Sequence, residues 1–468
     1  MSVLTGIYRS SLALLTDLYQ VTMAYAHWRA GTTRREAVFQ LFFRRHPFGG
    51  GFTVACGLAP AVEFLEAFRF TTDDLDYLAS LTGNDGAPLF VEPFLRELEA
   101  MRLEIDLDAV PEGTVVFPHE PLLRVRGPIL QAQLVETPLL NLVNFQTLVA
   151  TKTARVVLAA QGDPVIEFGL RRAQGIDGAL AASRAAWIGG CAASSSLLAG
   201  RLWGMPVRGT HAHSWVMAFP SEREAFAAYA EALPNNCIFL VDTYDSLAGV
   251  DHAIEIGHEL RARGHELVGI RLDSGDLAYL SAEARRRLDA AGFPKAVIVG
   301  SNDLDEHLIE NLKLQGARID VWGVGTRLVT GWEEPALGGV YKLTALRAEG
   351  GEWEYKLKLS EQAIKVTNPG IQQVRRYRLA GEAIGDLIYD ELLGPAAPPT
   401  LIDPLDLTRR KRVTPEAEGE DLLTPVLRAG SRVGVLPGEA EAPKRAQREL
   451  AEFHAGIKRF VHPHTYPA

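Results

Sequence analysis

The stretch "LVGIRLDSGDLAYLS", residues 267–281, carries the pattern that decides the fold. It begins with an apolar run of strand length and continues with apolar residues at helical spacing. Arg271 and Asp273 are two positions apart, so in a continuing strand both side chains point to the same face. Asp276 stands where a helix N-cap is expected. We therefore expect a strand that presents a guanidinium beside a carboxylate, followed by a helix; a plain ion pair with a capping residue is the simpler interpretation.

Five further apolar runs repeat this arrangement, and longer helical patterns separate them. Strands that alternate with helices form parallel βα units, which close into a barrel or spread into a doubly wound sheet. The runs are "PVIEFG" (164–169), "MPVRGT" (205–210), "CIFLVDT" (237–243), "KAVIVGS" (295–301) and "IDVWGVGT" (319–326).

Polar residues follow the apolar part of these runs, where a parallel strand ends. In a barrel the strand ends converge on one mouth, whose loops build the active site. In a doubly wound sheet they spread along one edge, and only those near a switch point meet. The residues concerned are Arg171, His211, His213, Asp242, Arg271, Asp273, Ser301, Asn302, Gly325 and Thr326.

The chain before and after this series of strands and helices has a different sequence pattern. The N-terminal part mixes strands and helices, and it includes a helix expected within residues 11–31 that Gly31 ends. The C-terminal part has a turn-rich connector, the basic run Arg409–Arg412 that we interpret as a solvated loop, and a last helix within residues 443–460. We expect three domains: 1–135, 136–342, and a C-terminal region 343–468 that packs partly on the first.

Composition excludes several classes of protein. The chain has 468 residues, 47% of them hydrophobic, which is enough for more than one core. Its net charge of -10 gives no indication of a nucleic-acid-binding surface. No window of the sequence reaches the roughly 18 apolar residues of a membrane span. Three scattered cysteines suggest neither disulfides nor a thiolate zinc site. We expect a soluble protein of the reducing cytoplasm.

The segment "GTHAHSW", residues 209–215, places His211 and His213 one residue apart. A metal site is weakly supported because no third ligand stands beside the pair. Two loop histidines without a function are one interpretation. The other is a nucleophile, because an imidazole has an ordinary pKa of ~6.5 and its neutral form can accept a phosphoryl group.

Three more segments carry groups suited to an anionic, ring-containing ligand. "VWGVGTRL" presents backbone amides beside Gly323, Gly325 and Thr326, an arrangement that can accommodate phosphate. "EFGLRRAQG" places Phe168 three residues before Arg171, which suits a flat anion, although a core phenylalanine and a surface arginine would look the same. "LVDTYDS" offers Asp242 and Asp245 for magnesium, held through water, or for loop hydrogen bonds.

Several separated motifs together resemble the nicotinate phosphoribosyltransferase family, in matching order to about residue 345. The resemblance implies the type II phosphoribosyltransferase fold, an irregular, incomplete TIM-like α/β barrel joined to an α/β sandwich, assembled as a homodimer with shared active sites. The four-cysteine zinc cluster of some relatives is excluded here. The motifs are "LLTDLYQVTMAYA", "EFGLRRAQG", "GTHAHSW", "VDTYD", "IRLDSGDL", "SNDLDE", "GVGT" and "LGGVYKL".

The resemblance implies roles for the pyridine and ATP sites. Tyr19 matches a tyrosine that enters the partner subunit's pocket, where the ring stacks between it and Phe168. Arg171, with Thr210 and Arg271, would hold nicotinate and the phosphoribosyl group. His213 matches the histidine that ATP transiently phosphorylates, whereas no role carries over to His211.

The remaining site residues would bind the phosphoribosyl part. Asp242 and Asp273 would position ribose hydroxyls or water on Mg²⁺, with no direct protein ligand to the metal. Ser301 would line the same site, and the 5-phosphate would lie against Gly323, Gly325 and Thr326.

The implied reaction joins nicotinate to 5-phosphoribosyl 1-diphosphate, coupled to ATP hydrolysis, and yields nicotinate mononucleotide and diphosphate for NAD salvage. Nicotinamide phosphoribosyltransferase is the closest alternative, but its pocket uses an aspartate where this chain has Ser194–Ser196. Quinolinate phosphoribosyltransferase would need a more basic pocket and no phosphorylatable histidine. A non-catalytic phosphoribosyl- or nucleotide-binding regulator would have no use for His213.

Overall fold

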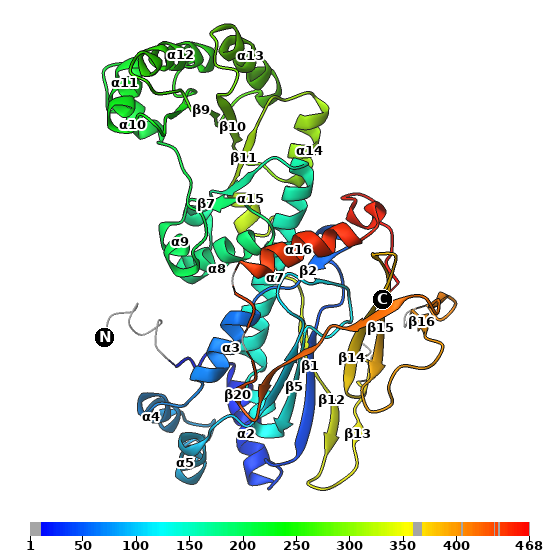
Figure 1. The fold of residues 1–468 in the computed structure, drawn as a ribbon. Coiled ribbons are helices and arrows are strands. Elements are labelled where there is room, and N and C mark those ends of the chain that lie inside the picture. Colours follow the sequence, from blue (N-terminus) through cyan, green and yellow to red (C-terminus); the bar gives the residue numbers. More distant parts are fainter. Residues whose placement is uncertain (1–10, 359–366, 404–405, 435, 439, 468) are drawn as a thin grey trace. The chain divides into compact units, whose positions relative to one another are not determined.

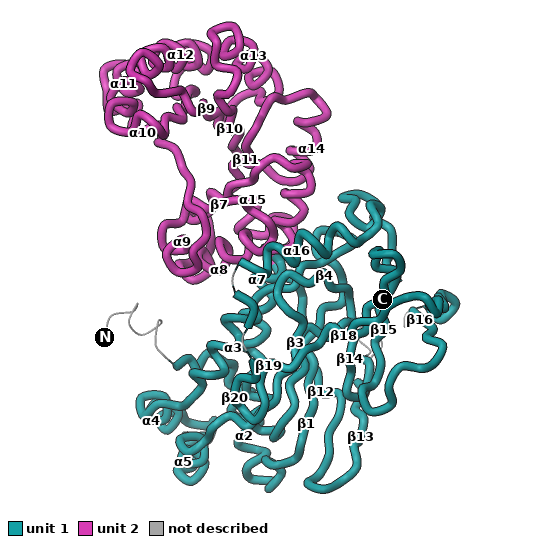
Figure 2. The backbone as a smooth tube through the Cα atoms, in the orientation of Figure 1, with its two compact units in different colours: residues 1–148, 336–468 teal, residues 149–335 magenta. Residues whose placement is uncertain are grey.

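The computed structural model describes residues 11–358, 367–403, 406–434, 436–438 and 440–467. It divides into two compact units (Figure 2). The smaller unit comprises residues 149–335, and the larger combines 1–148 with 336–468. The C-terminal part of the chain therefore shares a unit with the N-terminal part.

The smaller unit contains a six-stranded parallel sheet in the order β7-β6-β11-β10-β9-β8 (Figure 1). In this order β6, its first strand in sequence, pairs with β11, its last, and the other neighbours are consecutive. That is the strand order of a barrel with one open seam, between β7 and β8, whereas a doubly wound sheet would not pair its first and last strands. The bounds are β6 (Val165–Glu167), β7 (Ala193–Ser194), β8 (Ile238–Leu240), β9 (Gly269–Leu272), β10 (Val297–Ser301) and β11 (Val321–Val324).

Helices follow these strands, and an aspartate side chain caps the N-terminus of three of these helices. Asp276 accepts a hydrogen bond from Tyr279 N at the start of α13, as the sequence predicts. Asp245 and Asp305 cap α12 and α14 in the same way. The helices of this unit are α8 (Gly175–Ile188), α9 (Leu197–Trp203), α10 (His213–Met217), α11 (Glu222–Ala232), α12 (Ser246–Ala262), α13 (Leu277–Ala290), α14 (Glu306–Leu314) and α15 (Thr326–Val329), together with the end of α7 (Glu136–Ala160).

One predicted strand is wrong. The run at residues 205–210 forms only an isolated bridge between Val207 and Ser194 of β7. Gly204, with φ +68°, turns the chain immediately before it, and Pro206 has no N–H to donate, so a regular ladder cannot extend. The segment lies beside β7, which borders the open seam between β7 and β8.

The larger unit is built on a seven-stranded antiparallel sheet in the order β13-β12-β1-β5-β3-β19-β20. One continuous core cluster joins this sheet to helices α2 to α7. The strands are β1 (Glu36–Phe42), β3 (Asp106–Ala109), β5 (Leu123–Pro128), β12 (Val340–Arg347), β13 (Glu354–Tyr355), β19 (Thr424–Arg428) and β20 (Ser431–Arg432). The helices are α2 (Leu18–Arg29), α3 (Leu58–Ala67), α4 (Thr72–Ser80), α5 (Glu92–Ala100), α6 (Ile129–Leu134) and the start of α7.

The C-terminal segment adds a second layer of short strands and one helix to this unit. The last helix, α16 (Glu441–Glu452), ends earlier than predicted and is followed by the short turn Ala455–Lys458. The basic run, expected as a loop, forms the exposed strand β17 (Arg410–Arg412), which pairs with β16 (Thr400–Ile402). The segment's other strands are β14 (Gln372–Leu379), β15 (Glu382–Asp390) and β18 (Glu418–Asp421). The N-terminal part of the same unit contributes a separate pair, β2 (Thr53–Val54) and β4 (Val115–Val116).

Within the described part of the chain, no helix combines the length and the apolar character needed to cross a membrane.

Candidate active site

The strand register of the smaller unit gathers the predicted polar residues at one edge of its sheet. Leu240 of β8 pairs with Arg271 of β9, and Ser301 of β10 pairs with Gly323 of β11. Because the strands are parallel, the loops that follow them leave from the same edge. The sheet edge thus brings together side chains from segments far apart in the sequence.

Arg271 is the centre of this cluster. Its Nε donates to Ser301 Oγ at 2.8 Å, its Nη1 to Thr210 Oγ1 at 3.2 Å, and its Nη2 to Asp273 Oδ1 at 2.7 Å. Its guanidinium carbon lies 5.2 Å from the centroid of the Phe168 ring. The ion pair expected with Asp273 is therefore present, and the planar fork also fixes three loops relative to one another.

Two aspartates brace the loop after β9. Asp242 Oδ2 accepts from Asp273 N at 2.9 Å and from Ser274 Oγ at 2.6 Å. Asp242 Oδ1 is buried without a hydrogen-bond partner among the described residues. Burial by itself raises the pKa of Asp273, but the charge of Arg271 and hydrogen bonds from Ser301 and Arg271 outweigh it, so its pKa lies below the ordinary value. Asp273 is thus ionised at neutral pH.

His213 is the first residue of α10. One of its ring nitrogens lies at hydrogen-bond distance from a hydroxyl, and the other is directed to a carboxylate. Its Nδ1 lies 3.1 Å from Thr243 Oγ1, and its Nε2 lies 3.8 Å from Asp273 Oδ2. The side chain is 40% exposed. The imidazole is therefore held in one orientation while remaining accessible to a second molecule.

His211 has a different environment, which the sequence did not predict. Its Nε2 accepts from Leu240 N at 3.2 Å, and its ring packs among Phe226, Tyr229 and Phe239. Burial lowers the pKa of His211, and so does the nearby Arg271. This histidine is a neutral structural residue that ties the histidine loop to β8.

Glycines let the loop after β11 approach Phe168. A Cβ at Gly323 would lie 2.6 Å from a Phe168 ring carbon, and a Cβ at Gly325 would lie 3.3 Å from Phe168 O. Thr326 begins the short helix α15 directly afterwards. The half-buried Phe168 ring thus lies between the glycine strand and the Arg271 guanidinium, with bare backbone amides beside it.

Two further residues predicted for the site are exposed, and they belong to different units. Arg171 is exposed on the 3-10 turn Leu170–Arg172 and, among the described residues, makes no hydrogen bond to the cluster. Tyr19 lies in the first turn of α2, in the larger unit, and is 47% exposed.

An ion pair that was not predicted from the sequence links two loops of the site. Arg327, which follows Thr326, pairs with Asp305, the residue that caps α14. The loops after β10 and β11 are thereby held together. The signal in the sequence was a basic residue directly after the "GVGT" glycines, but nothing in the sequence identifies its partner.

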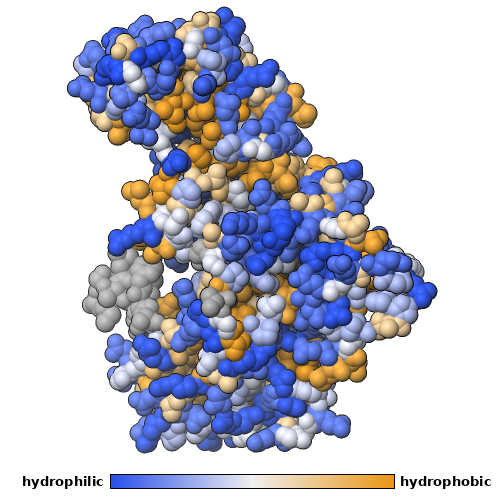
Figure 3. Space-filling model, in the orientation of Figure 1, coloured by the Kyte–Doolittle hydropathy of each residue, from blue (hydrophilic) through white to orange (hydrophobic). Residues whose placement is uncertain are grey.

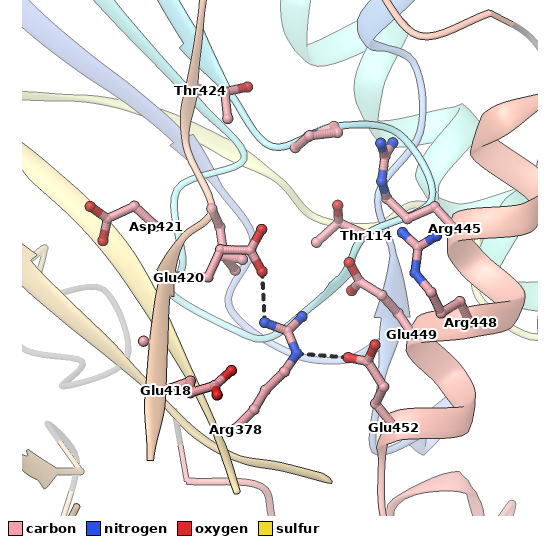
Figure 4. Close-up of a pocket in the computed structure, with 13 residues that line it drawn as sticks. Thr114, Arg378, Glu418, Glu420, Asp421, Thr424, Arg445, Arg448, Glu449 and Glu452 are labelled. Carbon is pink, nitrogen blue, oxygen red and sulfur yellow. Dashed lines mark hydrogen bonds and ion pairs between the residues drawn. The ribbon is translucent and has the colours of Figure 1, made fainter. Parts of the chain in front are cut away.

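The larger unit contains cavities of its own. Figure 4 shows one of about 550 Å³, walled by β14, β18 and α16. Several of its charged side chains are paired: Arg378 pairs with both Glu420 and Glu452, and Glu449 pairs with the buried Arg376. A second cavity, of about 1130 Å³, is also lined wholly by residues of this unit.

The arrangement at the sheet edge of the smaller unit suits one kind of chemistry. A guanidinium fork and bare amides can hold phosphate oxygens, and carboxylates can hold sugar hydroxyls. An accessible imidazole can act as a nucleophile toward phosphorus, and a half-buried aromatic ring can stack on a flat ligand.

Comparison with known proteins agrees with this description. Residues 14–144 match the nicotinate phosphoribosyltransferase N-terminal domain, and residues 372–468 match its C-terminal domain. The nicotinate phosphoribosyltransferase of Bacillus subtilis (strain 168) is 44% identical over 99% of this chain and 93% of its own. The Homo sapiens nicotinate phosphoribosyltransferase is 39% identical over 97% of this chain and 93% of its own.

A solved structure shares the fold as well. The crystal structure of human nicotinic acid phosphoribosyltransferase superposes with a TM-score of 0.83 at 35% identity, covering 96% of both chains. The predicted type II phosphoribosyltransferase fold is thereby confirmed. The similarity over nearly the full length, in fold and in sequence, shows that the chain belongs to the nicotinate phosphoribosyltransferase family.

Proposed function

We propose that this protein transfers the phosphoribosyl group of 5-phosphoribosyl 1-diphosphate to nicotinate and couples the transfer to ATP hydrolysis through a phosphorylated His213. The products are nicotinate mononucleotide, diphosphate, ADP and phosphate. The observation that carries the proposal is the single cluster formed by Phe168, His213, Arg271 and Asp273.

In the proposed transfer, the pyridine nitrogen forms a bond to the anomeric carbon as the bond to diphosphate breaks. Positive charge develops on the ribosyl group, and negative charge grows on the leaving diphosphate. Arg271 would stabilise the diphosphate oxygens, and the ionised Asp273 would hold a ribose hydroxyl. Phe168 would stack on the pyridine ring, and the amides of Gly325 and Thr326 would hold the 5-phosphate.

In the coupling step, a ring nitrogen of His213 attacks the γ-phosphorus of ATP and ADP leaves. Water later cleaves the phosphorus–nitrogen bond and releases phosphate. Support comes from the accessible ring and from Thr243, which holds Nδ1 and leaves Nε2 directed toward Asp273. Capture of the transferred group by Nε2 would place its charge near Asp273, whose own charge Arg271 offsets through their ion pair.

Magnesium fits the same site through phosphate and water. The proposal places the ion on phosphate oxygens and water, and no group of three or more metal-ligating side chains occurs in the described part of the chain. The buried, unpartnered Asp242 Oδ1 is a suitable acceptor for a metal-bound water, and Asp273 lies directly beside it. A bound Mg²⁺ would neutralise diphosphate charge.

The structure also supports nicotinate over nicotinamide as the substrate. In the segment where the alternative enzyme uses an aspartate, Ser196 accepts from Ala199 N as the cap of α9, and Ser194 donates to the buried Glu167. These serines present no carboxylate to a ligand, and a carboxylate there would repel an anion.

We propose a homodimer in which Tyr19 of one subunit completes the site of the other. Exposed apolar side chains on both units support this, because such surface is normally covered in an assembly. Figure 3 shows hydrophobic residues reaching the surface among hydrophilic ones. The exposed apolar side chains include Leu18, Tyr19 and Met23 of α2, and Leu197, Leu198 and Leu202 of α9. The three buried free thiols are compatible with a cytoplasmic location.

The proposed function is tested by product formation from labelled nicotinate or labelled nicotinamide, each with 5-phosphoribosyl 1-diphosphate and Mg²⁺. We expect nicotinate mononucleotide to form, faster with ATP than without it, and nicotinamide to react more slowly. Faster turnover of nicotinamide would reject the substrate assignment. An absence of product from either base would support a non-catalytic role instead.

A further inference from the structure

Glu167, the last residue of β6, is a fully buried carboxylate that accepts hydrogen bonds from three neutral groups in the described part of the chain. Its exposed fraction is 0%. It accepts hydrogen bonds from Gly169 N, from Ser183 Oγ at 2.9 Å and from Ser194 Oγ at 2.6 Å. Burying a carboxylate is costly, so its retention at this position needs a reason.

Two of these three hydrogen bonds come from segments at the sheet edge that carries the proposed active site: the loop after β6 and the end of β7. The bond from Gly169 N closes the chain around Phe168, so that the carboxylate fixes the backbone on both sides of the aromatic ring. The bond from Ser194 Oγ reaches β7, where the same hydroxyl accepts from Ser196 N at 2.9 Å.

The backbone reinforces this connection. Glu167 pairs with Ser194 in the sheet, and Glu167 O accepts from Ser195 N at 2.9 Å. Glu167 therefore holds the Phe168 loop and the serine loop in one geometry. The third donor, Ser183, belongs to α8 and to neither loop.

We propose that Glu167 is a positioning residue for the pyridine subsite, acting through Phe168 and the Ser194–Ser196 turn. The inference rests on the proposed function, because it assumes that the ring stacks on Phe168. Glu167 does not touch the ligand. Its carboxylate fixes the Phe168 ring, on which the pyridine would stack, relative to the Ser194–Ser196 turn, which would distinguish nicotinate from nicotinamide.

A carboxylate fits this position better than a neutral amide of equal size. Its oxygens only accept, and its three hydrogen-bond partners, Gly169 N–H and the hydroxyls of Ser183 and Ser194, all donate to it. In a glutamine, one oxygen becomes an NH₂ group, which cannot accept from the fixed Gly169 N–H or from the Ser194 hydroxyl. With the NH₂ group on that side, the Ser194 hydroxyl would lose the acceptor for its proton and would have to turn, so the serine loop would lose its link to residue 167, although Ser194 Oγ could still accept from Ser196 N.

The test is the steady-state kinetics of Glu167→Gln with nicotinate and 5-phosphoribosyl 1-diphosphate varied in turn. We expect KM for nicotinate to rise about tenfold or more, as for one unsatisfied buried polar group. We expect KM for 5-phosphoribosyl 1-diphosphate to change less than about threefold and the thermal midpoint to remain within a few degrees. The wild-type enzyme is assayed first, since failure to convert nicotinate would reject the proposed function rather than the role of Glu167.

Three matched variants sharpen the result. Ser183→Ala removes one hydrogen bond from the same carboxylate without touching either loop, so it should leave KM for nicotinate within about threefold. Gly323→Ala should reproduce the rise in KM, because its Cβ would displace the Phe168 ring directly. Ser194→Ala by itself should raise KM for nicotinate. The double variant with Glu167→Gln should raise this KM by less than the product of the two separate fold-changes.

An unchanged KM for nicotinate in Glu167→Gln would overturn the proposal. So would an equal loss in Ser183→Ala, or equal changes in both KM values and the thermal midpoint, since these indicate a general structural role. If Glu167→Gln does not fold, Ser194→Ala decides: a normal KM for nicotinate in that variant rejects the positioning role.

Discussion

Replacing Arg271 with alanine is expected to reduce kcat/KM for phosphoribosyl transfer by about 10² to 10³, the effect of losing one well-placed donor to a developing charge. The reason is the number of restraints that one guanidinium supplies. It holds Ser301, Thr210 and Asp273 at hydrogen-bond distance and lies over the Phe168 ring. The measurement is initial-rate kinetics with both substrates varied.

Two controls separate this effect from a change of charge or of fold. Arg286→Ala removes an exposed arginine of α13 that pairs with Glu283, and it should change activity little. Arg271→Lys keeps the charge but loses the planar fork, so it should restore only a small part of the rate. Activity near wild type in Arg271→Ala would show that the cluster is not the site of transfer.

Replacing His213 with alanine is expected to abolish the stimulation of product formation by ATP while retaining a slow, ATP-independent transfer. The imidazole is the nucleophile of the proposed coupling step, whereas the groups proposed to hold nicotinate and the sugar phosphate are other members of the cluster. The measurements are the product rate with and without ATP, and transfer of the γ-phosphoryl group from labelled ATP to the protein.

His258→Ala is the matched control for this variant. His258 is an exposed histidine of α12, beside Phe293, and its loss should leave both the stimulation and the label unchanged. Persistent ATP stimulation in His213→Ala would eliminate the phosphohistidine. A complete loss of the ATP-independent reaction would place His213 in the transfer step itself.

The sequence alone predicted much of the smaller unit because its signals are local. Each strand that ends in a polar residue is a short apolar run, and the capping role of Asp276 follows from its position before a helical pattern. The Arg271–Asp273 pair could be predicted because alternate residues of a strand share a face.

What could not be predicted depends on contacts between distant segments. Nothing local distinguishes the buried His211, which accepts from Leu240 N, from the accessible His213. The links from Glu167 to Ser194 and from Arg327 to Asp305 depend on strand order and register. The apolar composition of the run at 205–210 predicts a strand, but its proline and the preceding glycine turn prevent a ladder.

The structure of the protein with bound nicotinate mononucleotide tests the central claim most directly. We predict that the 5-phosphate lies within ~3 Å of the backbone amides of Gly325 and Thr326, a normal hydrogen-bond distance. The pyridine ring should stack on Phe168, with Tyr19 of the partner subunit on its other face. A nucleotide bound instead in a cavity of the larger unit, with the Arg271 cluster empty, would contradict the account.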